Sequence, residues 1–299
     1  LAFLNMQKST SILLPIGDFY KNIKVYENIF KEIDKQDFES SYLKELKEGL
    51  NKDGGSLKAI KELKKIGSYI DLRQNFVASI ILNAIVLWDF YCIDMFDKWK
   101  KSYGKNIRTY LEIVGEIEAL ISLASITYVR DDYTFAKVNE CDDLKPEIDF
   151  KNLKHPLIKI EDAVGNGITL KGQTCVITGS NMSGKTTFLR SIGINLVLSY
   201  AGGPALASEF KTSVMKVLTS IRVEDNVNKG ISTFYAELLR IKDMTEYNKN
   251  KMPMICLIDE IFKGTNSADR IICATEAIKK LSQPWSITLV STHDFELCN

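Results

Sequence analysis

Residues 179–186 read Gly-Ser-Asn-Met-Ser-Gly-Lys-Thr, a full G-x-x-x-x-G-K-[ST] phosphate loop. A nucleoside triphosphate needs backbone N–H donors aimed at one anion, a cation near its β and γ oxygens, and a hydroxyl that holds magnesium. The loop offers all three, because its glycines let the backbone curl around phosphates. We therefore predict a nucleotide site made of Gly179, Ser180, Asn181, Met182, Ser183, Gly184, Lys185, Thr186 and Thr187. A glycine-rich turn without a ligand is the alternative.

Two acids follow an apolar run further along the chain. Residues 254–258 are Met-Ile-Cys-Leu-Ile, and Asp259 and Glu260 come directly after them. In a Walker B arrangement, Asp259 would reach magnesium through water and Glu260 would polarise the attacking water. Adjacent acids after a strand are individually ordinary surface residues, but their place after a phosphate loop favours the catalytic interpretation.

A histidine follows another apolar run. Residues 286–291 predict a buried strand, and His293 would lie at the same edge of the sheet as the loop. A neutral imidazole there can bind the γ-phosphate or the water, which favours a sensor over a loop histidine with a satisfied hydrogen bond. The other histidine, His155, precedes Pro156 and is expected to be structural.

Residues 230–240 predict a helix that begins at Ser232 and Thr233. A helix N-terminus with a free hydroxyl is an anion site, and its plain interpretation is an N-cap.

These residues need a sheet to position them. Residues 173–178 predict a strand before the loop, and 187–198 predict a helix after it. From about residue 133 on, short β-branched runs alternate with helices, which predicts an α/β sheet with its ligand at the carboxyl ends of the strands. The predicted strands are 158–160, 174–178, 215–223, 254–258 and 286–291.

The preceding residues predict helices only. Ser56 is expected to cap a helix with Leu57, Ile60, Leu63 and Ile66 on one face, and two further helices are expected over about 71–99 and 106–129. With a boundary in the polar stretch near 130–150, we expect an all-helical domain over 1–130 and an α/β domain over 131–299.

The amino-acid composition excludes few classes of protein. The chain has 299 residues, 45% of them apolar, and its net charge of +1 argues neither for nor against nucleic acid. Its six cysteines form no C-x-x-C pair, which is typical of reduced thiols. The apolar stretch 76–88 is too short to cross a bilayer. We expect a cytoplasmic protein with no membrane partner, and the start at Leu1 suggests a fragment of a longer chain.

Four runs stand in a telling order: Thr178-Gly-Ser-Asn-Met-Ser-Gly-Lys-Thr-Thr187, Gly230-Ile-Ser-Thr-Phe234, Asp259-Glu-Ile-Phe-Lys-Gly-Thr-Asn-Ser267 and Ser291-Thr-His-Asp-Phe-Glu-Leu297. Together they resemble the MutS family of ATPases, in particular the branch without a clear mismatch-reading module. The likeness is strong over about 150–297 and weaker over about 40–130, where it is to the core and lever helices of the family.

The resemblance implies an α/β P-loop NTPase fold of the ABC type, a mixed sheet flanked by helices, preceded by a helical domain. It implies ATP and Mg²⁺ as ligands, a homodimer with composite sites, and DNA as partner in mismatch repair or a related process. Lys185, Thr186, Asp259, Glu260 and His293 would act in cis. Ser232 and Thr233 would approach the γ-phosphate of the opposite subunit, and the interface would include Asn181, Gly264, Thr265, Asn266 and Ser267.

Some features depart from the family. The adenine-stacking aromatic would fall near Ala163, and the single Phe-x-Glu, at residues 30–32, lies in an apparent amphipathic helix, so we expect a core Phe30 and a surface Glu32. The alternative function is a nucleotide-gated assembly module with little hydrolysis and a non-DNA partner, which has no need of Glu260. A chromosomal ATPase with long coiled-coil arms would need longer helices.

Overall fold

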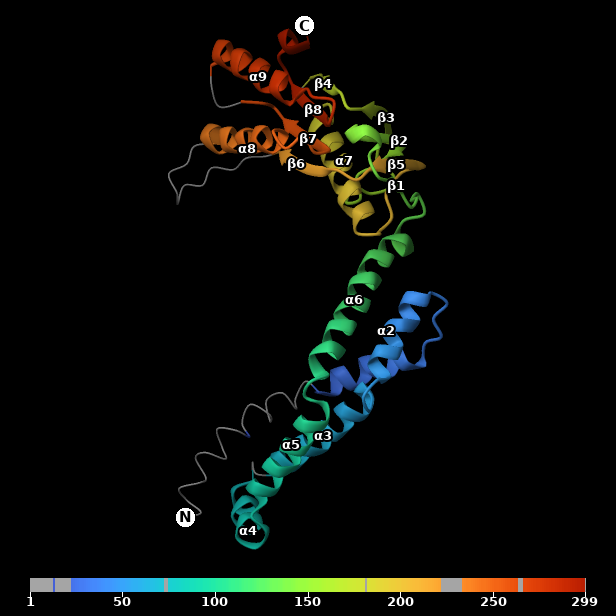
Figure 1. Ribbon diagram of the computed structural model, residues 1–299, viewed down its shortest axis with the longest axis vertical. Coiled ribbons are helices and arrows are strands. Elements are labelled where there is room, and N and C mark those ends of the chain that lie inside the picture. The colour runs from blue at the N-terminus through green and yellow to red at the C-terminus, as the bar shows by residue number, and fades with distance from the viewer. Residues whose placement is uncertain are drawn as a thin grey trace. The chain divides into compact units, whose positions relative to one another are not determined.

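The computed structural model describes residues 13, 23–72, 75–180, 182–221, 233–262 and 266–298. Its contacts divide the chain into two compact units, Leu1–Ile121 and Ser122–Asn299. The division falls inside helix α6, Ile107–Val129. Figure 1 shows the elements of both units.

All elements described in the first unit are helices. A helical segment over 23–35 is followed by α2 (Ser41–Asn51), α3 (Ser56–Asp71), α4 (Phe76–Val86), α5 (Trp88–Tyr103) and the first part of α6. The helix expected over about 106–129 is confirmed by α6.

The single helix expected over about 71–99 is wrong. Leu87, between α4 and α5, has φ 51° and ψ 50°, in the left-handed region where a right-handed helix cannot continue. The apolar pattern runs across this break, so periodicity alone did not reveal it. Ser56 is also not the cap of α3. The N-cap is Gly55 with φ 82°, a value that glycine adopts at low cost, and Ser56 is the first helical residue.

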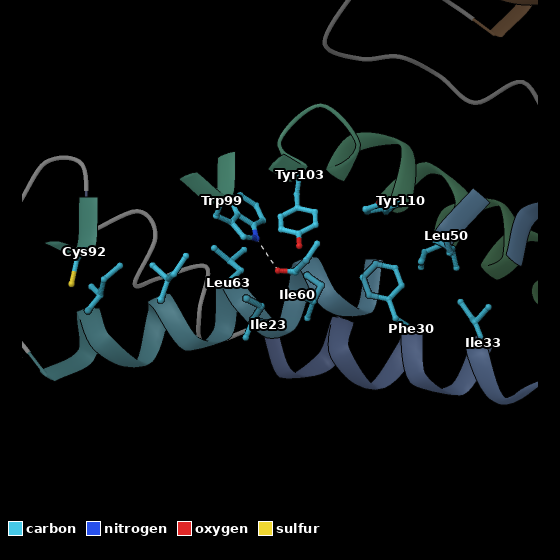
Figure 2. Close-up of a cluster of buried hydrophobic side chains, with 14 of the residues drawn as sticks. Ile23, Phe30, Ile33, Leu50, Ile60, Leu63, Cys92, Trp99, Tyr103 and Tyr110 are labelled. Atoms are coloured by element: carbon cyan, nitrogen blue, oxygen red, sulfur yellow. Dashed lines mark hydrogen bonds between the residues drawn. The ribbon is translucent and has the colours of Figure 1, made fainter. Parts of the chain in front are cut away.

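Aromatic side chains hold the helices of the first unit together. Figure 2 shows Phe30, Trp99 and Tyr110 among aliphatic residues of α3 and the segment 23–35. The Trp99 indole Nε1 donates to the Ala59 carbonyl at 2.8 Å, so its one polar atom is satisfied inside the core. Phe30 is 2% exposed and Glu32 is exposed, as expected of a core residue and its surface neighbour.

In the part of the chain that the structure describes, no single helix has the length and apolarity needed to cross a membrane. One bent pair, Ser79–Val86 with Trp88–Tyr103 at 77°, meets the length and composition criteria together.

The second unit begins with a sheet that the sequence did not predict. Its strand order is β1 (Lys137–Asn139), β5 (Glu209–Ser213), β2 (Glu147–Leu153) and β3 (Asn166–Lys171), with the β5–β2 and β2–β3 pairs antiparallel. β2 alternates charged residues with the buried Ile148 and Phe150, the pattern of a strand with only one face in a core. The strand expected over 158–160 is wrong, because those residues form turns and irregular backbone.

A second sheet is parallel and has the order β4 (Thr174–Thr178), β8 (Ser286–Thr292), β7 (Met254–Asp259) and β6 (Lys216–Ser220). These strands confirm four of the expected ones, although β6 covers only 216–220 of the described part of the predicted 215–223. The helices of this unit are α7 (Lys185–Tyr200), α8 (Thr233–Asn248) and α9 (Ser267–Leu281), and short 3-10 turns cover Asp142–Leu144 and Phe295–Cys298.

Helices cover both faces of the parallel sheet. Alternate residues of β7, Ile255 and Leu257, pack in one cluster with α7, while the residues between them pack in a second cluster with α8 and α9. All but the last residue of β7 are buried, as expected for a strand covered on both sides. The second unit is thus an α/β structure, and Figure 1 shows α8 and α9 next to each other and apart from α7.

Five cysteines of the described residues form no disulfide: Cys92, Cys141, Cys175, Cys256 and Cys273. Burial inside β7 raises the pKa of Cys256 to about 12, so this thiol is inert at neutral pH.

Candidate nucleotide-binding site

The predicted chemistry converges on one edge of the parallel sheet. β4, β7 and β8 run in the same direction, with Thr178 opposite Thr292 and Asp259 opposite Ser291. Their carboxyl ends therefore lie side by side and lead into the phosphate loop, Glu260 and His293. This is the edge where ligands bind in open α/β sheets.

The phosphate loop joins β4 to α7, which confirms the expected strand, loop and helix. Gly184 caps α7 with φ 92°, and Met182 has φ 64° and is fully exposed. Lys185 is 9% exposed, and its ammonium donates to the Gly179 and Ser180 carbonyls at 2.8 and 2.9 Å. The Lys185 ammonium is thus held by backbone carbonyls of the phosphate loop itself. Of the other described loop residues, Gly179 and Thr186 are half-buried. Ser180, Ser183, Gly184 and Thr187 are exposed.

The Thr186 hydroxyl meets the Asp259 carboxylate. Thr186 Oγ1 donates to Asp259 Oδ2 at 2.8 Å, and Ser291 Oγ donates to Asp259 Oδ1 at 2.6 Å. Both oxygens of this carboxylate are therefore oriented by hydroxyls, one from the loop and one from β8. Ser291 is fully buried, which fixes its rotamer and so the plane of the carboxylate.

The backbone turns sharply after β7. Glu260 has φ 53° and Phe262 has φ 58°, both in the left-handed region. Such a conformation costs a residue other than glycine about 1–3 kcal/mol, so surrounding contacts must impose it. The Glu260 N–H lies 3.1 Å from the Ser291 carbonyl and 3.0 Å from Ser291 Oγ, and it donates to both. The Phe262 N–H donates to the Glu237 carboxylate of α8 at 2.6 Å.

His293 bridges the acid and the loop. Its Nδ1 lies 3.0 Å from the Gly179 carbonyl and its Nε2 lies 2.9 Å from Glu260 Oε1. Since a carbonyl oxygen can only accept, the hydrogen of the first bond is on Nδ1. The second bond then joins either an imidazolium to a carboxylate or a neutral ring to a protonated carboxyl. With side chains 38% and 24% exposed, His293 and Glu260 are open to water and to a ligand.

The segment that carries His293 is tied to α9. Arg270 donates from Nε and Nη2 to the two oxygens of Asp294 at 2.7 and 2.9 Å. The Asp294 N–H donates to Thr292 Oγ1 at 3.0 Å. A bidentate pair of this kind fixes orientation as well as distance, so the residue between these anchors is held in place.

The other predicted site residues are placed as follows. Asn181, Ser232, Gly264 and Thr265 lie outside the described residues. Thr233 and Ser267 are the first residues of α8 and α9. Asn266 is exposed and caps α9, and its side-chain oxygen accepts from the Asp269 N–H at 2.9 Å. The structure therefore brings together Gly179, Lys185, Thr186, Asp259, Glu260 and His293.

Two residues that were not predicted to belong to the site, His155 and Ala163, precede β3 in the chain. His155 is half-buried, and its Nδ1 accepts from the Leu157 N–H at 3.2 Å, which agrees with a structural role. Burial, with a smaller effect from Arg190, lowers the pKa of His155. Ala163 is half-buried beside a turn.

Sequence reasoning missed the residues that orient the site. Ser291, Arg270 and Glu237 act on Asp259, on the His293 segment and on the turn after β7. For Ser291 a signal existed, because it is a hydroxyl residue two positions before His293, at the carboxyl end of a predicted strand. For Arg270 and Glu237 the sequence carried none, since each is one charged residue among several on its helix.

Comparison with known proteins bears on the same part of the chain. Residues 175–299 match the family model for MutS domain V. The DNA mismatch repair protein MutS of Thermus caldophilus is 30% identical over 200 residues, covering 65% of this chain and 23% of that protein. The DNA mismatch repair protein MSH3 of Vanderwaltozyma polyspora is 34% identical over 166 residues, covering 52% of this chain and 15% of that protein.

A third relative, the DNA mismatch repair protein MutS of Haloquadratum walsbyi, is 31% identical over 201 residues, covering 64% of this chain and 20% of that protein. The matched segment thus spans between 15% and 23% of the length of these relatives. Residues 175–299, which include the phosphate loop and most of the parallel sheet, are thus similar to domain V of MutS proteins.

Proposed function

We propose that this chain carries the ATPase of a MutS-type protein, which binds MgATP at the carboxyl edge of the parallel sheet and hydrolyses it. One observation carries the proposal: Lys185, the Thr186–Asp259 pair and the Glu260–His293 pair lie at one sheet edge and are joined by hydrogen bonds. A phosphate-binding loop alone would support binding. The acid and histidine beside it support turnover.

The donor set suits magnesium. The Thr186 hydroxyl and the Asp259 carboxylate are both hard oxygen donors, and Mg²⁺ is commonly bound by one or two such groups together with substrate phosphates. Among the described residues, no group of three or more His, Cys, Asp or Glu could hold a metal by itself. When bound, magnesium neutralises charge on the β and γ oxygens.

The chain's own residues supply the remaining steps. Lys185 exchanges the Gly179 and Ser180 carbonyls for phosphate oxygens, which keeps its charge compensated. Glu260 orients the attacking water and accepts its proton. His293 holds Glu260 and the Gly179 carbonyl at once, so a change at the γ-phosphate reaches the acid through one side chain.

We also propose the wider arrangement that the family resemblance implies. It comprises a helical domain over 1–130 and an ABC-type ATPase domain over 131–299, joined into a homodimer that acts on DNA. Ser232 of one subunit would complete the site of the other, with residues 264–267 at the interface. ATP would then close the dimer, because only ATP has a γ-phosphate that touches both subunits.

Turnover of ATP by the purified protein tests the proposal. We expect Lys185→Ala to abolish hydrolysis and binding, and Glu260→Gln to abolish hydrolysis while the protein retains ATP. The exposed Lys249 pairs with Glu246 on α8, so Lys249→Ala is a matched control that should hydrolyse normally. No turnover above the Lys185→Ala background would refute the ATPase.

Glu260→Gln also separates the two functions considered. An ATPase dimer should be trapped with ATP by this change, which light scattering with and without nucleotide would detect. An assembly module with little hydrolysis would show the same nucleotide-dependent mass for both proteins. DNA binding should weaken steeply as salt rises, since phosphate contacts release counterions. Binding that does not change with salt would exclude this kind of contact.

A further inference from the structure

One buried charge has no place in the proposed reaction. Glu237 lies in α8 and is only 6% exposed. The buried residues of its helix, Ile241 and Met244, belong to an apolar cluster with Ile261 and Phe262. A carboxylate in such surroundings is destabilising unless hydrogen bonds compensate it. An apolar residue would pack there at lower cost, so its presence calls for a role.

Glu237 accepts a hydrogen bond from the backbone of the turn after β7. Its Oε1 accepts from the Phe262 N–H at 2.6 Å, and the Phe262 ring packs against the ring of Phe234 with centroids 5.9 Å apart. α8 therefore contacts this turn at two points, the Phe262 backbone N–H and the Phe262 ring. Phe262 is 3% exposed, so water cannot easily replace the carboxylate.

This turn determines where Glu260 points. Glu260 and Phe262 both have positive φ values, and hydrogen bonds hold the turn at its two ends. At the first end, Ser291 of β8 accepts from the Glu260 N–H, and at the second end Glu237 accepts from the Phe262 N–H. Without the second bond, the two residues would relax towards ordinary backbone angles. The Glu260 side chain would then move away from His293.

We propose that Glu237 is a positioning residue for Glu260, which makes the orientation of the proposed water-activating acid depend on the placement of α8. The inference rests on the proposed ATPase function and adds a residue to it. A shift of α8 by about 1 Å would break the short bond to Phe262, and misplacement of a reacting group on this scale can lower a rate by about a hundredfold. We expect nucleotide binding to be retained, since Lys185 and Thr186 of the phosphate loop lie outside this turn.

Three substitutions of Glu237 separate the effect of its hydrogen bond on turnover from the effect of its charge. Glu237→Gln keeps an acceptor oxygen at the same reach and removes the charge. Glu237→Asp keeps the charge and withdraws the acceptor by about 1.5 Å, one carbon–carbon bond. Glu237→Leu removes both while it fills the space. Glu246→Gln is the control, since Glu246 is an exposed acid on the same helix that pairs with Lys249.

Steady-state kinetics and ATP binding are measured on each protein, with thermal unfolding to show that it is folded. We expect kcat to fall at least about tenfold for Asp and Leu, and to stay within about threefold of wild type for Gln and the control. The dissociation constant for ATP should stay within about twofold throughout. If Leu does not fold, the contrast between Asp and Gln still decides.

Two results overturn the inference. If Asp is as active as wild type while Gln is not, the charge and not the bond to Phe262 matters. If the Asp and Leu variants turn over normally, or lose ATP binding rather than kcat, Glu237 does not position Glu260. Both leave the ATPase proposal intact as long as wild type turns over and Lys185→Ala does not. No turnover in wild type would refute both.

Discussion

If this chain hydrolyses ATP as proposed, Ser291→Ala should raise its magnesium requirement without abolishing turnover. In the native site, Ser291 Oγ donates to Asp259 Oδ1 over 2.6 Å and accepts from the Glu260 N–H at 3.0 Å. Alanine removes the hydroxyl from a fully buried position and changes little else.

The two bonds contribute unequally. A hydrogen bond to a charged group is worth about 1.5–3 kcal/mol, and a short hydroxyl–carboxylate bond belongs to this class. Its loss frees the Asp259 carboxylate to rotate about the one remaining hydroxyl, that of Thr186. The Glu260 N–H keeps the Ser291 carbonyl at 3.1 Å, so it is not left unpaired and the turn is retained.

The expected change is therefore in metal affinity. A loss of 1.5–3 kcal/mol corresponds to about 10–150-fold, and loss of a group that orients a metal ligand typically costs about 10–100-fold. ATP turnover is measured against free Mg²⁺ at saturating ATP. We expect the half-saturating Mg²⁺ concentration to rise about 10–100-fold, while kcat at high Mg²⁺ stays within about fivefold of wild type.

Ser286→Ala is the matched control. Ser286 is equally buried on the same strand, but it lies at the other end of β8 and its hydroxyl meets Thr288 Oγ1 at 3.2 Å. It should leave the Mg²⁺ dependence unchanged. An Mg²⁺ curve of Ser291→Ala that superimposes on wild type, or a fall in kcat with an unchanged Mg²⁺ requirement, would refute this reasoning.

The remaining three predictions concern stability. Gly172 has φ 54°, and a Cβ there would lie 2.3 Å from the Pro284 carbonyl oxygen, so Gly172→Ala should destabilise the second unit by about 2–3 kcal/mol. Gly115→Ala, in open space on α6, should instead stabilise by about 0.5–1 kcal/mol in the same denaturation assay, and equal effects would contradict the argument. Glu27 is paired with two lysines, which lower its pKa to about 2. Its contribution, at most about 3 kcal/mol, is present above pH 4.5 and lost as pH falls towards 2, so Glu27→Gln should flatten the decline in the free energy of unfolding over this interval.

The sequence predicted the parallel sheet well because its central strands, β7 and β8, are buried on both faces. β7 is a continuous apolar run up to Asp259, and β8 has Ile287, Leu289 and Val290 at its centre, so both are visible without knowledge of their neighbours. The phosphate loop is equally local, since its glycines, Lys185 and Thr186 must be adjacent in the chain to surround one anion. These elements account for the predicted place of the site.

The rest depends on contacts between distant parts of the chain. β2 reads as polar because only Ile148, Phe150 and Leu153 enter a core, and its pairing with β5 brings together residues far apart in sequence. The left-handed Leu87 lies inside an apolar run that no periodicity divides. The orienting role of Ser291 exists only because β8 pairs with β7, which a single strand cannot indicate.

The strand order also sets the order in which the second unit can fold. Within the described residues, β4 pairs in the parallel sheet with β8 alone, and β8 follows every other described strand in chain order. During synthesis, β4, which leads into the phosphate loop, therefore has no partner strand in the parallel sheet until residue 292 has emerged from the ribosome. Closing so long a loop delays folding, and the apolar edges of β4 and β7 are exposed to aggregation in the meantime. A nascent chain that ends before β8 should behave as a substrate for chaperones even though it already contains the whole phosphate loop.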